Sequence, residues 1–188
     1  MLVLASKSPR RIELLKDLGL AFTVLPSQKE ERILPGAAPY EVARSLAQQK
    51  AQDVFSMQPN AVVIGADTVV SYEGEIFGKP AGDAQAFYML SRLSGNWHDV
   101  YTGVCIKSKD KQVCTYEATR VKFKNLSQNQ IETYIETREP MDKAGAYGIQ
   151  GMGRLFVEKI EGDFFNVVGL PVCRLGILLE ECFGIHIL

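Results

Sequence analysis

The start of the chain combines a short apolar run, a tight polar turn and an amphipathic stretch. Leu2–Ala5 predicts a strand, and Ile12–Leu18, closed by Gly19, predicts a helix. Ser8 suits the N-cap, and Pro9 suits the first helical position, where a missing N–H costs nothing. The chain therefore begins with a strand, a tight turn and a helix whose free amides point outward with partial positive charge.

Three cationic side chains stand in or beside this turn, namely Lys7, Arg10 and Arg11. Outward-pointing amides and forked guanidinium groups together suit the oxygens of a phosphate. The turn is no P-loop, because the glycine-rich sequence GxxxxGK(S/T) is absent. Two interpretations stay open from this stretch alone: a phosphate site, or a capped surface helix whose arginines are solvated.

A chain of 188 residues is long enough for one domain with a sizeable core and room for two lobes. The net charge of −1 provides no global basic field, so nucleic acid is not expected as a partner. The apolar run at the start is too short for a signal peptide, and no stretch could span a membrane. We therefore expect a cytoplasmic protein that forms a single domain over residues 1–188.

The cysteines and histidines show no metal-binding spacing. None of the cysteines forms a CxxC pair, and neither histidine stands near them at ligand spacing; these residues are Cys105, Cys114, Cys173, Cys182, His98 and His186. Zinc is therefore not expected. We expect the thiols to act as small buried hydrophobes.

A lysine interrupts the apolar face of the helix predicted for residues 39–55. Lys50 falls near the centre of the stripe formed by Ala43, Leu46, Ala47, Ala51 and Val54. A lysine that points inward loses hydration unless its ammonium reaches water or meets an anion. Either this side chain snorkels to the surface, or its ammonium projects into a cleft to meet phosphate or carboxylate.

The continuous apolar run Ala61–Ile64 predicts a strand covered on both faces, and it ends in Gly65-Ala66-Asp67-Thr68. A carboxylate at the carboxyl end of a central strand lies where open α/β sheets place ligands. Gly65 would let a backbone or a ligand approach closely. We favour a functional role for Asp67 over a role in capping the next turn.

Three further segments carry polar groups suited to a ligand. The pair Glu30-Glu31 lies in a polar loop, where it is either solvated or holds a cation, and Gly78-Lys79-Pro80 is a rigid turn that directs a lysine. The segment 142–153 is dense in glycine, so its backbone either approaches a ligand or forms a mobile surface loop. Its Gln150 could recognise a base edge through its amide. Leu155–Ile160 and Phe164–Val168 predict a hairpin.

Together these features make up the parts of a phosphoryl-transfer site. The cations Arg10, Arg11, Lys50 and Lys79 suit phosphates, and the carboxylates Glu31 and Asp67 suit a divalent metal and a water. Carboxylate ligands without a His/Cys cluster favour a hard cation, Mg²⁺ or Mn²⁺.

Several long motifs resemble the Maf family of nucleoside triphosphate pyrophosphatases. They stand in the family's order from Leu4 to Pro171, and they are LASKSPRRIELL, the Glu30-Glu31 pair, GADTVV, GKP, LSGNWHDVYTGV, EPMDKAGAYGIQG and NVVGLP. The resemblance implies an α/β fold like that of inosine triphosphate pyrophosphatase, with a mixed twisted sheet, flanking helices and two lobes around a central cleft. It also implies metal-dependent hydrolysis of a nucleoside triphosphate to the monophosphate and pyrophosphate.

Residue roles follow from the same resemblance, motif by motif. Asp67 matches the family's proton acceptor, and Arg10 and the AGAYGIQG loop resemble the branch that acts on dTTP and UTP, with modified pyrimidine nucleotides as further candidates. We expect catalytic roles for Asp67, Lys50 and Lys79, metal binding by Glu31 and Asp67, and substrate binding by Ser6, Ser8, Arg10, Arg11, Thr68 and Gln150. The family also suggests a homodimer. Its implied link to septum formation leaves one alternative, a non-catalytic nucleotide-binding regulator of cell division.

Overall fold

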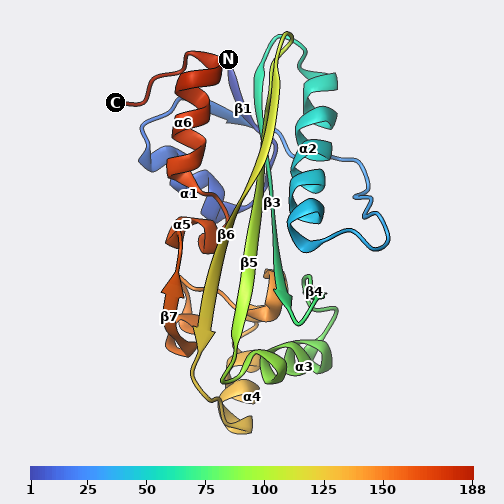
Figure 1. Ribbon diagram of the computed structural model, residues 1–188, viewed down its shortest axis with the longest axis vertical. Helices are drawn as coiled ribbons and strands as arrows, with labels where there is room; N and C mark the ends of the chain where they lie inside the picture. The colour runs from blue at the N-terminus through green and yellow to red at the C-terminus, as the bar shows by residue number, and fades with distance from the viewer.

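A seven-stranded mixed sheet runs the length of the protein in a computed structural model that describes residues 1–188 (Figure 1). The strand order is β2-β1-β3-β5-β6-β7, and β4 pairs with β3. β1 is parallel to both of its neighbours, whereas all other pairs are antiparallel. The strands are β1 (Leu2–Leu4), β2 (Phe22–Val24), β3 (Val62–Tyr72), β4 (Glu75–Phe77), β5 (Trp97–Lys107), β6 (Gln112–Phe123) and β7 (Val157–Glu161).

Helices gather at the two ends of the long strands, which gives the two lobes expected from the sequence (Figure 1). At one end α2 lies on one side of the strands and α1 and α6 lie on the other, while α3 and α4 lie at the opposite end. No helix is both long and apolar enough to cross a membrane. The helices are α1 (Pro9–Asp17), α2 (Pro39–Met57), α3 (Asp83–Leu93), α4 (Gln128–Glu136), α5 (Phe164–Val168) and α6 (Val172–Phe183), with 3-10 turns η1 (Glu139–Asp142), η2 (Ala144–Ala146) and η3 (Met152–Phe156).

The predicted end of the central strand was wrong, because β3 continues through Asp67 to Tyr72. Its parallel neighbour β1 pairs only with Val62–Ile64, and β4 pairs only with Val70–Tyr72 on the other half of the strand. One edge of β3 therefore has no strand beside it over residues 65–69. Asp67 lies in the middle of this gap, just beyond the carboxyl end of β1. The strand whose end marks the expected ligand site is therefore β1 and not β3.

Two further expectations also failed. Phe164–Val168 forms the helix α5 instead of a hairpin strand, because the Asp163 side chain accepts a hydrogen bond from the Phe165 amide at 2.8 Å and caps the helix. β7 pairs with β6 instead. Cys105 and Cys114, which face each other across β5 and β6, form a disulfide, and Cys173 is exposed, so these thiols are not simply small buried hydrophobes.

Two glycines let α2 lie directly against the sheet. A Cβ on Gly65 would lie 2.2 Å from the Ala47 carbonyl oxygen, and one on Gly103 would lie 2.2 Å from the Ala43 carbonyl oxygen. The sequence indicates that a backbone or a ligand approaches Gly65 closely, and in the structure the backbone of α2 does so. Because Gly103 pairs with Asp67 in the β3–β5 ladder, this contact sets the distance between α2 and Asp67.

The Gly103→Ala substitution tests this contact. The new Cβ would overlap the α2 backbone, so we expect the free energy of unfolding to fall by about 1–3 kcal/mol or more, measured by urea denaturation. Gly78→Ala is the matched control, since nothing lies within 4 Å of that position, and it should change stability by less than about 0.5 kcal/mol. Equal losses in the two variants would contradict the packing argument.

Candidate active site

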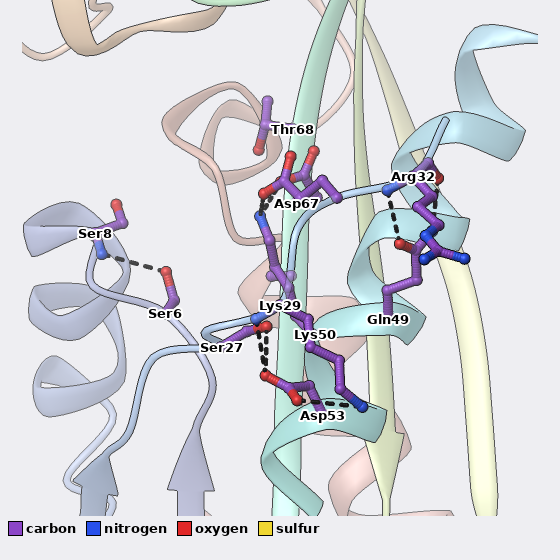
Figure 2. Close-up of polar contacts among 12 residues, drawn as sticks. Ser6, Ser8, Ser27, Lys29, Arg32, Gln49, Lys50, Asp53, Asp67 and Thr68 are labelled. Atoms are coloured by element: carbon purple, nitrogen blue, oxygen red, sulfur yellow. Dashed lines mark hydrogen bonds and ion pairs between the residues drawn. The ribbon is translucent and has the colours of Figure 1, made fainter. Parts of the chain in front are cut away.

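Lys50 lies between two carboxylates. Its ammonium forms an ion pair with Asp67 Oδ1 (Figure 2) and a second one with Glu31 Oε1 at 2.9 Å. The side chains of Lys50 and Asp67 are only 16% and 14% exposed, whereas that of Glu31 is 50% exposed. Of the two interpretations of the lysine on the apolar face of α2, the structure therefore supports the one in which it meets an anion.

Arg11 is buried, and all three nitrogens of its guanidinium form hydrogen bonds within the chain. Nε donates to the Gly169 carbonyl at 2.7 Å, and Nη1 donates to the Ala66 carbonyl at 2.9 Å and to Ser6 Oγ at 3.3 Å. Nη2 donates to Thr68 Oγ1 at 3.0 Å. Burial lowers the pKa of Arg11, and the nearby Asp67 carboxylate opposes that shift. Four of its five N–H groups thus bind groups of this protein, so Arg11 holds together the gap in β3, and one N–H of Nη2 has no such partner.

Thr68 is part of a chain of hydroxyl groups that begins at Arg11. Thr102 Oγ1 donates to the Asn166 carbonyl at 2.9 Å, so the proton between Thr68 and Thr102, 2.9 Å apart, belongs to Thr68. Thr68 therefore accepts from Arg11 and donates inward. This chain ties the gap in β3 to α5, and it commits the Thr68 hydroxyl proton to the protein interior.

The turn before α1 differs from the expected N-cap. Pro9 is the first helical residue, as expected, but the Ser8 hydroxyl makes no capping hydrogen bond. Instead the buried Ser6 Oγ accepts from the Ser8 amide at 3.2 Å (Figure 2). The Ser8 hydroxyl and the first turn of α1 thus remain available to an anion.

The other predicted residues make contacts of their own, apart from Lys50 and Asp67. Arg10 forms a partly exposed ion pair with Asp142 of η1, at 3.8 Å. Gln150 lines a cavity of about 650 Å³ with Glu13, which lies one turn after Arg10 on α1. Lys79 is exposed, and its turn contacts the glycine segment through a hydrogen bond from the Gly145 amide to the Gly78 carbonyl, at 3.1 Å. Neither Lys79 nor Gln150 contacts Lys50 or Asp67 directly.

Only two carboxylates are placed to hold a cation. Glu31 and Asp67 already converge on one positive charge, that of Lys50, and no group of three or more His, Cys, Asp and Glu residues is placed to bind a metal ion. Such a pair fits Mg²⁺ or Mn²⁺, which takes one or two protein carboxylates and fills its other positions with water and phosphate oxygens. It does not fit a closed structural metal site.

Sequence reasoning missed the residues that hold the polar loops. Asp53 and Gln49 of α2 bind the backbone around Glu31, and Glu139 binds the amides of Met152 and Gly153 in the segment that carries Gln150. Asp53 had a detectable signal, because it lies seven residues after Leu46 on the buried stripe that also contains Lys50. Gln49 and Glu139 gave no such signal.

Cations and carboxylates that meet at an open strand edge, beside a helix N-terminus, are typical of α/β proteins that act on phosphorylated ligands. In a comparison with known families, the family model described as "Maf-like protein" matches residues 1–182. The chain belongs to this Maf-like family.

Relatives with assigned names cover nearly the whole chain. A protein of Bacillus pumilus named dTTP/UTP pyrophosphatase is 50% identical over 184 residues, which are 98% of this chain and 97% of that protein. One of the same name from Caldicellulosiruptor bescii is 49% identical over 186 residues, covering 96% and 94% of the two chains. Among solved structures, the Ham1 protein of Staphylococcus aureus matches with a TM-score of 0.48 and 16% identity, over 65% of this chain and 71% of that one.

The two N-terminal arginines should respond differently to substitution by lysine. Arg11→Lys keeps the charge but loses the fork, so we expect it to lower the free energy of unfolding by about 1.5–3 kcal/mol. Arg10→Lys should change stability by less than about 0.5 kcal/mol, because the Arg10 ion pair is partly exposed. Urea denaturation of both variants checks this difference, and equal effects would show that the Arg11 network does not stabilise the fold.

Proposed function

We propose that this protein hydrolyses dTTP and UTP to the monophosphate and pyrophosphate. Membership of the Maf-like family and relatives at about 50% identity with that named activity support the reaction and the substrates. One observation carries the proposal: Lys50, Glu31 and Asp67 converge in the gap of β3, within reach of the turn that opens α1.

The triphosphate suits the turn between β1 and α1. The free amides at the start of α1 and the Ser8 hydroxyl offer hydrogen-bond donors to phosphate oxygens, and the helix dipole favours their negative charge. Arg10 stands beside this turn with only a loose ion pair to Asp142, so its guanidinium can turn toward the ligand. Lys79 is exposed near the glycine segment and adds a further positive charge.

The charge balance around Lys50 favours a divalent metal as part of the substrate complex. Two carboxylates face the single ammonium of Lys50, so the carboxylate oxygens that Lys50 does not bind would repel phosphate oxygens unless a cation lies between them. Glu31 and Asp67 are the residues that would hold Mg²⁺ or Mn²⁺. Such an ion, when bound, neutralises phosphate charge and makes a coordinated water more acidic.

Asp67 is placed to act as the general base. Its Oδ1 accepts the hydrogen bond from Lys50, which fixes the carboxylate, while its Oδ2 has no hydrogen-bond partner and can accept a proton from the attacking water. The Lys50 ammonium then faces the negative charge that develops on the leaving pyrophosphate. A carboxylate base of this kind contributes about 10²–10⁴-fold to the rate.

The cavity beside Gln150 suits the base of the nucleotide. Apolar side chains line it, and the polar groups of Gln150, Glu13 and Arg154 lie among them; the apolar residues are Ile149, Val157, Ile160 and Phe164. Uracil and thymine present two carbonyl acceptors and one N–H donor, and the Gln150 amide can both donate to and accept from that edge. Gln150 therefore favours these pyrimidines.

Asp67→Asn should abolish turnover and leave nucleotide binding in place. The amide keeps the shape of the carboxylate but cannot take the proton, so we expect kcat for dTTP to fall by about 10²-fold or more. Pyrophosphate release with Mg²⁺ measures kcat, and equilibrium binding of a non-hydrolysable dTTP analogue serves as the control. Turnover at the wild-type rate in this variant would refute the base assignment.

A panel of common nucleoside triphosphates tests both the reaction and the substrate. Pyrophosphate should be released fastest from dTTP and UTP with Mg²⁺ or Mn²⁺, and wild-type protein that releases none from any nucleotide would refute the proposed function. Gln150→Glu replaces an amide donor by a carboxylate that only accepts, so the preference for dTTP and UTP should fall by about tenfold. Unchanged relative rates would mean that Gln150 does not contact the base.

A further inference from the structure

The part of the chain around Glu31 makes no backbone–backbone hydrogen bonds. The segment of residues 26–38 connects β2 to α2 without a helix or a strand, and the one backbone hydrogen bond within it joins the Ala37 amide to the Leu34 carbonyl, after the exposed Glu31. The ion pair between Glu31 and Lys50 cannot order it alone, because a half-exposed pair contributes little against the entropy of a loop. Other contacts must keep Glu31 beside Lys50.

Asp53 of α2 binds the segment on the N-terminal side of Glu31. Its carboxylate is 6% exposed, and its Oδ2 accepts from Ser27 Oγ at 2.8 Å, from the Gln28 amide at 2.9 Å and from the Lys29 amide at 3.3 Å (Figure 2). The Lys29 ammonium lies 3.5 Å from Oδ1. Burial alone would raise the pKa of Asp53, but these hydrogen bonds lower it, so the carboxylate stays charged at neutral pH.

Gln49 binds the segment on the C-terminal side of Glu31. Its Oε1 accepts from the Arg32 amide at 3.0 Å, and its Nε2 donates to the Arg32 carbonyl at 2.8 Å (Figure 2). The same Nε2 lies 3.1 Å from Ser45 Oγ, which holds the amide in this orientation. One side chain therefore occupies both polar groups of one backbone residue, much as a paired strand would.

The three α2 residues that meet this segment lie on one side of the helix. Gln49, Lys50 and Asp53 are spaced so that Lys50 meets the Glu31 carboxylate while its neighbours fix the backbone before and after it. We propose that Asp53 and Gln49 are positioning residues, which hold the Glu31 carboxylate at Lys50 and Asp67 in the reactive geometry. The proposal rests on the proposed function only in that Glu31 takes part in the reaction.

Amide hydrogen exchange tests the binding of the segment without any assay of activity. Asp53→Asn should speed exchange at Gln28 and Lys29 by about tenfold or more, because it removes the charge that accepts both amides. Gln49→Ala should do the same at Arg32. Gln52→Ala is the matched control, since Gln52 bonds only to Ser56 within α2 and should leave all three amides unchanged. Unchanged exchange in both Asp53→Asn and Gln49→Ala would overturn the proposal.

A double-mutant cycle separates positioning from a general loss of structure. Asp53→Asn and Gln49→Ala should each lower kcat for dTTP by about fivefold or more in the wild-type background. In a Glu31→Gln background the same changes should alter kcat by less than about twofold, because the group that they position no longer acts. Equal losses in the two backgrounds would overturn the proposal, since a structural role would lower activity whether or not Glu31 is present.

Two further outcomes are distinguished by the same design. Should Asp53→Asn fail to fold, Gln49→Ala decides alone, because its contacts are exposed and its loss leaves the core intact. Wild-type protein that releases no pyrophosphate would refute the proposed function. It would also refute the claim that Asp53 and Gln49 hold Glu31 for catalysis. The exchange rates would then still decide whether Asp53 and Gln49 hold the segment.

Discussion

The close contact between α2 and the sheet is the constraint on which the rest of the site depends. Gly65 and Gly103 remove two side chains from β3 and β5, and the carbonyls of Ala47 and Ala43 fill that space. A helix held at this distance presents Lys50 directly to Asp67, with no room for a water layer that would weaken the ion pair. The small residues of β3, β5 and α2 thus strengthen the ion pair between Lys50 and Asp67, although none of them contacts either charged group.

The gap in the edge of β3 explains why groups from both faces of the sheet meet there. Side chains alternate along a strand, so Asp67 points toward α2 while Thr68 points toward α1. Between β1 and β4 no strand covers this edge, and Arg11 instead binds the Ala66 carbonyl there. A buried guanidinium therefore binds one carbonyl that a neighbouring strand would otherwise bind, and no strand covers the adjacent Asp67.

The sequence indicated which residues the structure brings together at Lys50, but not which contacts hold them in place. Periodicity placed Lys50 on a buried face and left two interpretations open, and the structure supports the one in which its ammonium meets an anion. The structural partners of Arg11 were not foreseen, because they include Gly169, 158 residues away, and no local pattern reveals such contacts. The expected contact of Arg11 with the substrate stays a prediction. The end of β3 was misplaced because the polar residues after Ile64 resemble a loop. Their backbone is nevertheless paired to β5, and only the tertiary fold determines that pairing.

The elements of the site differ in how firmly the backbone holds them. β3 is paired with β5 along most of its length, and α2 packs on these two strands in the core, whereas the segment with Glu31 depends on side chains of α2. Such a segment can open without unfolding the sheet, so its local stability is separate from the global stability of the protein. Opening would move Glu31 away and leave Lys50 paired with Asp67 alone. The position of Glu31 beside Lys50 therefore depends on the contacts that Gln49 and Asp53 of α2 make with the segment.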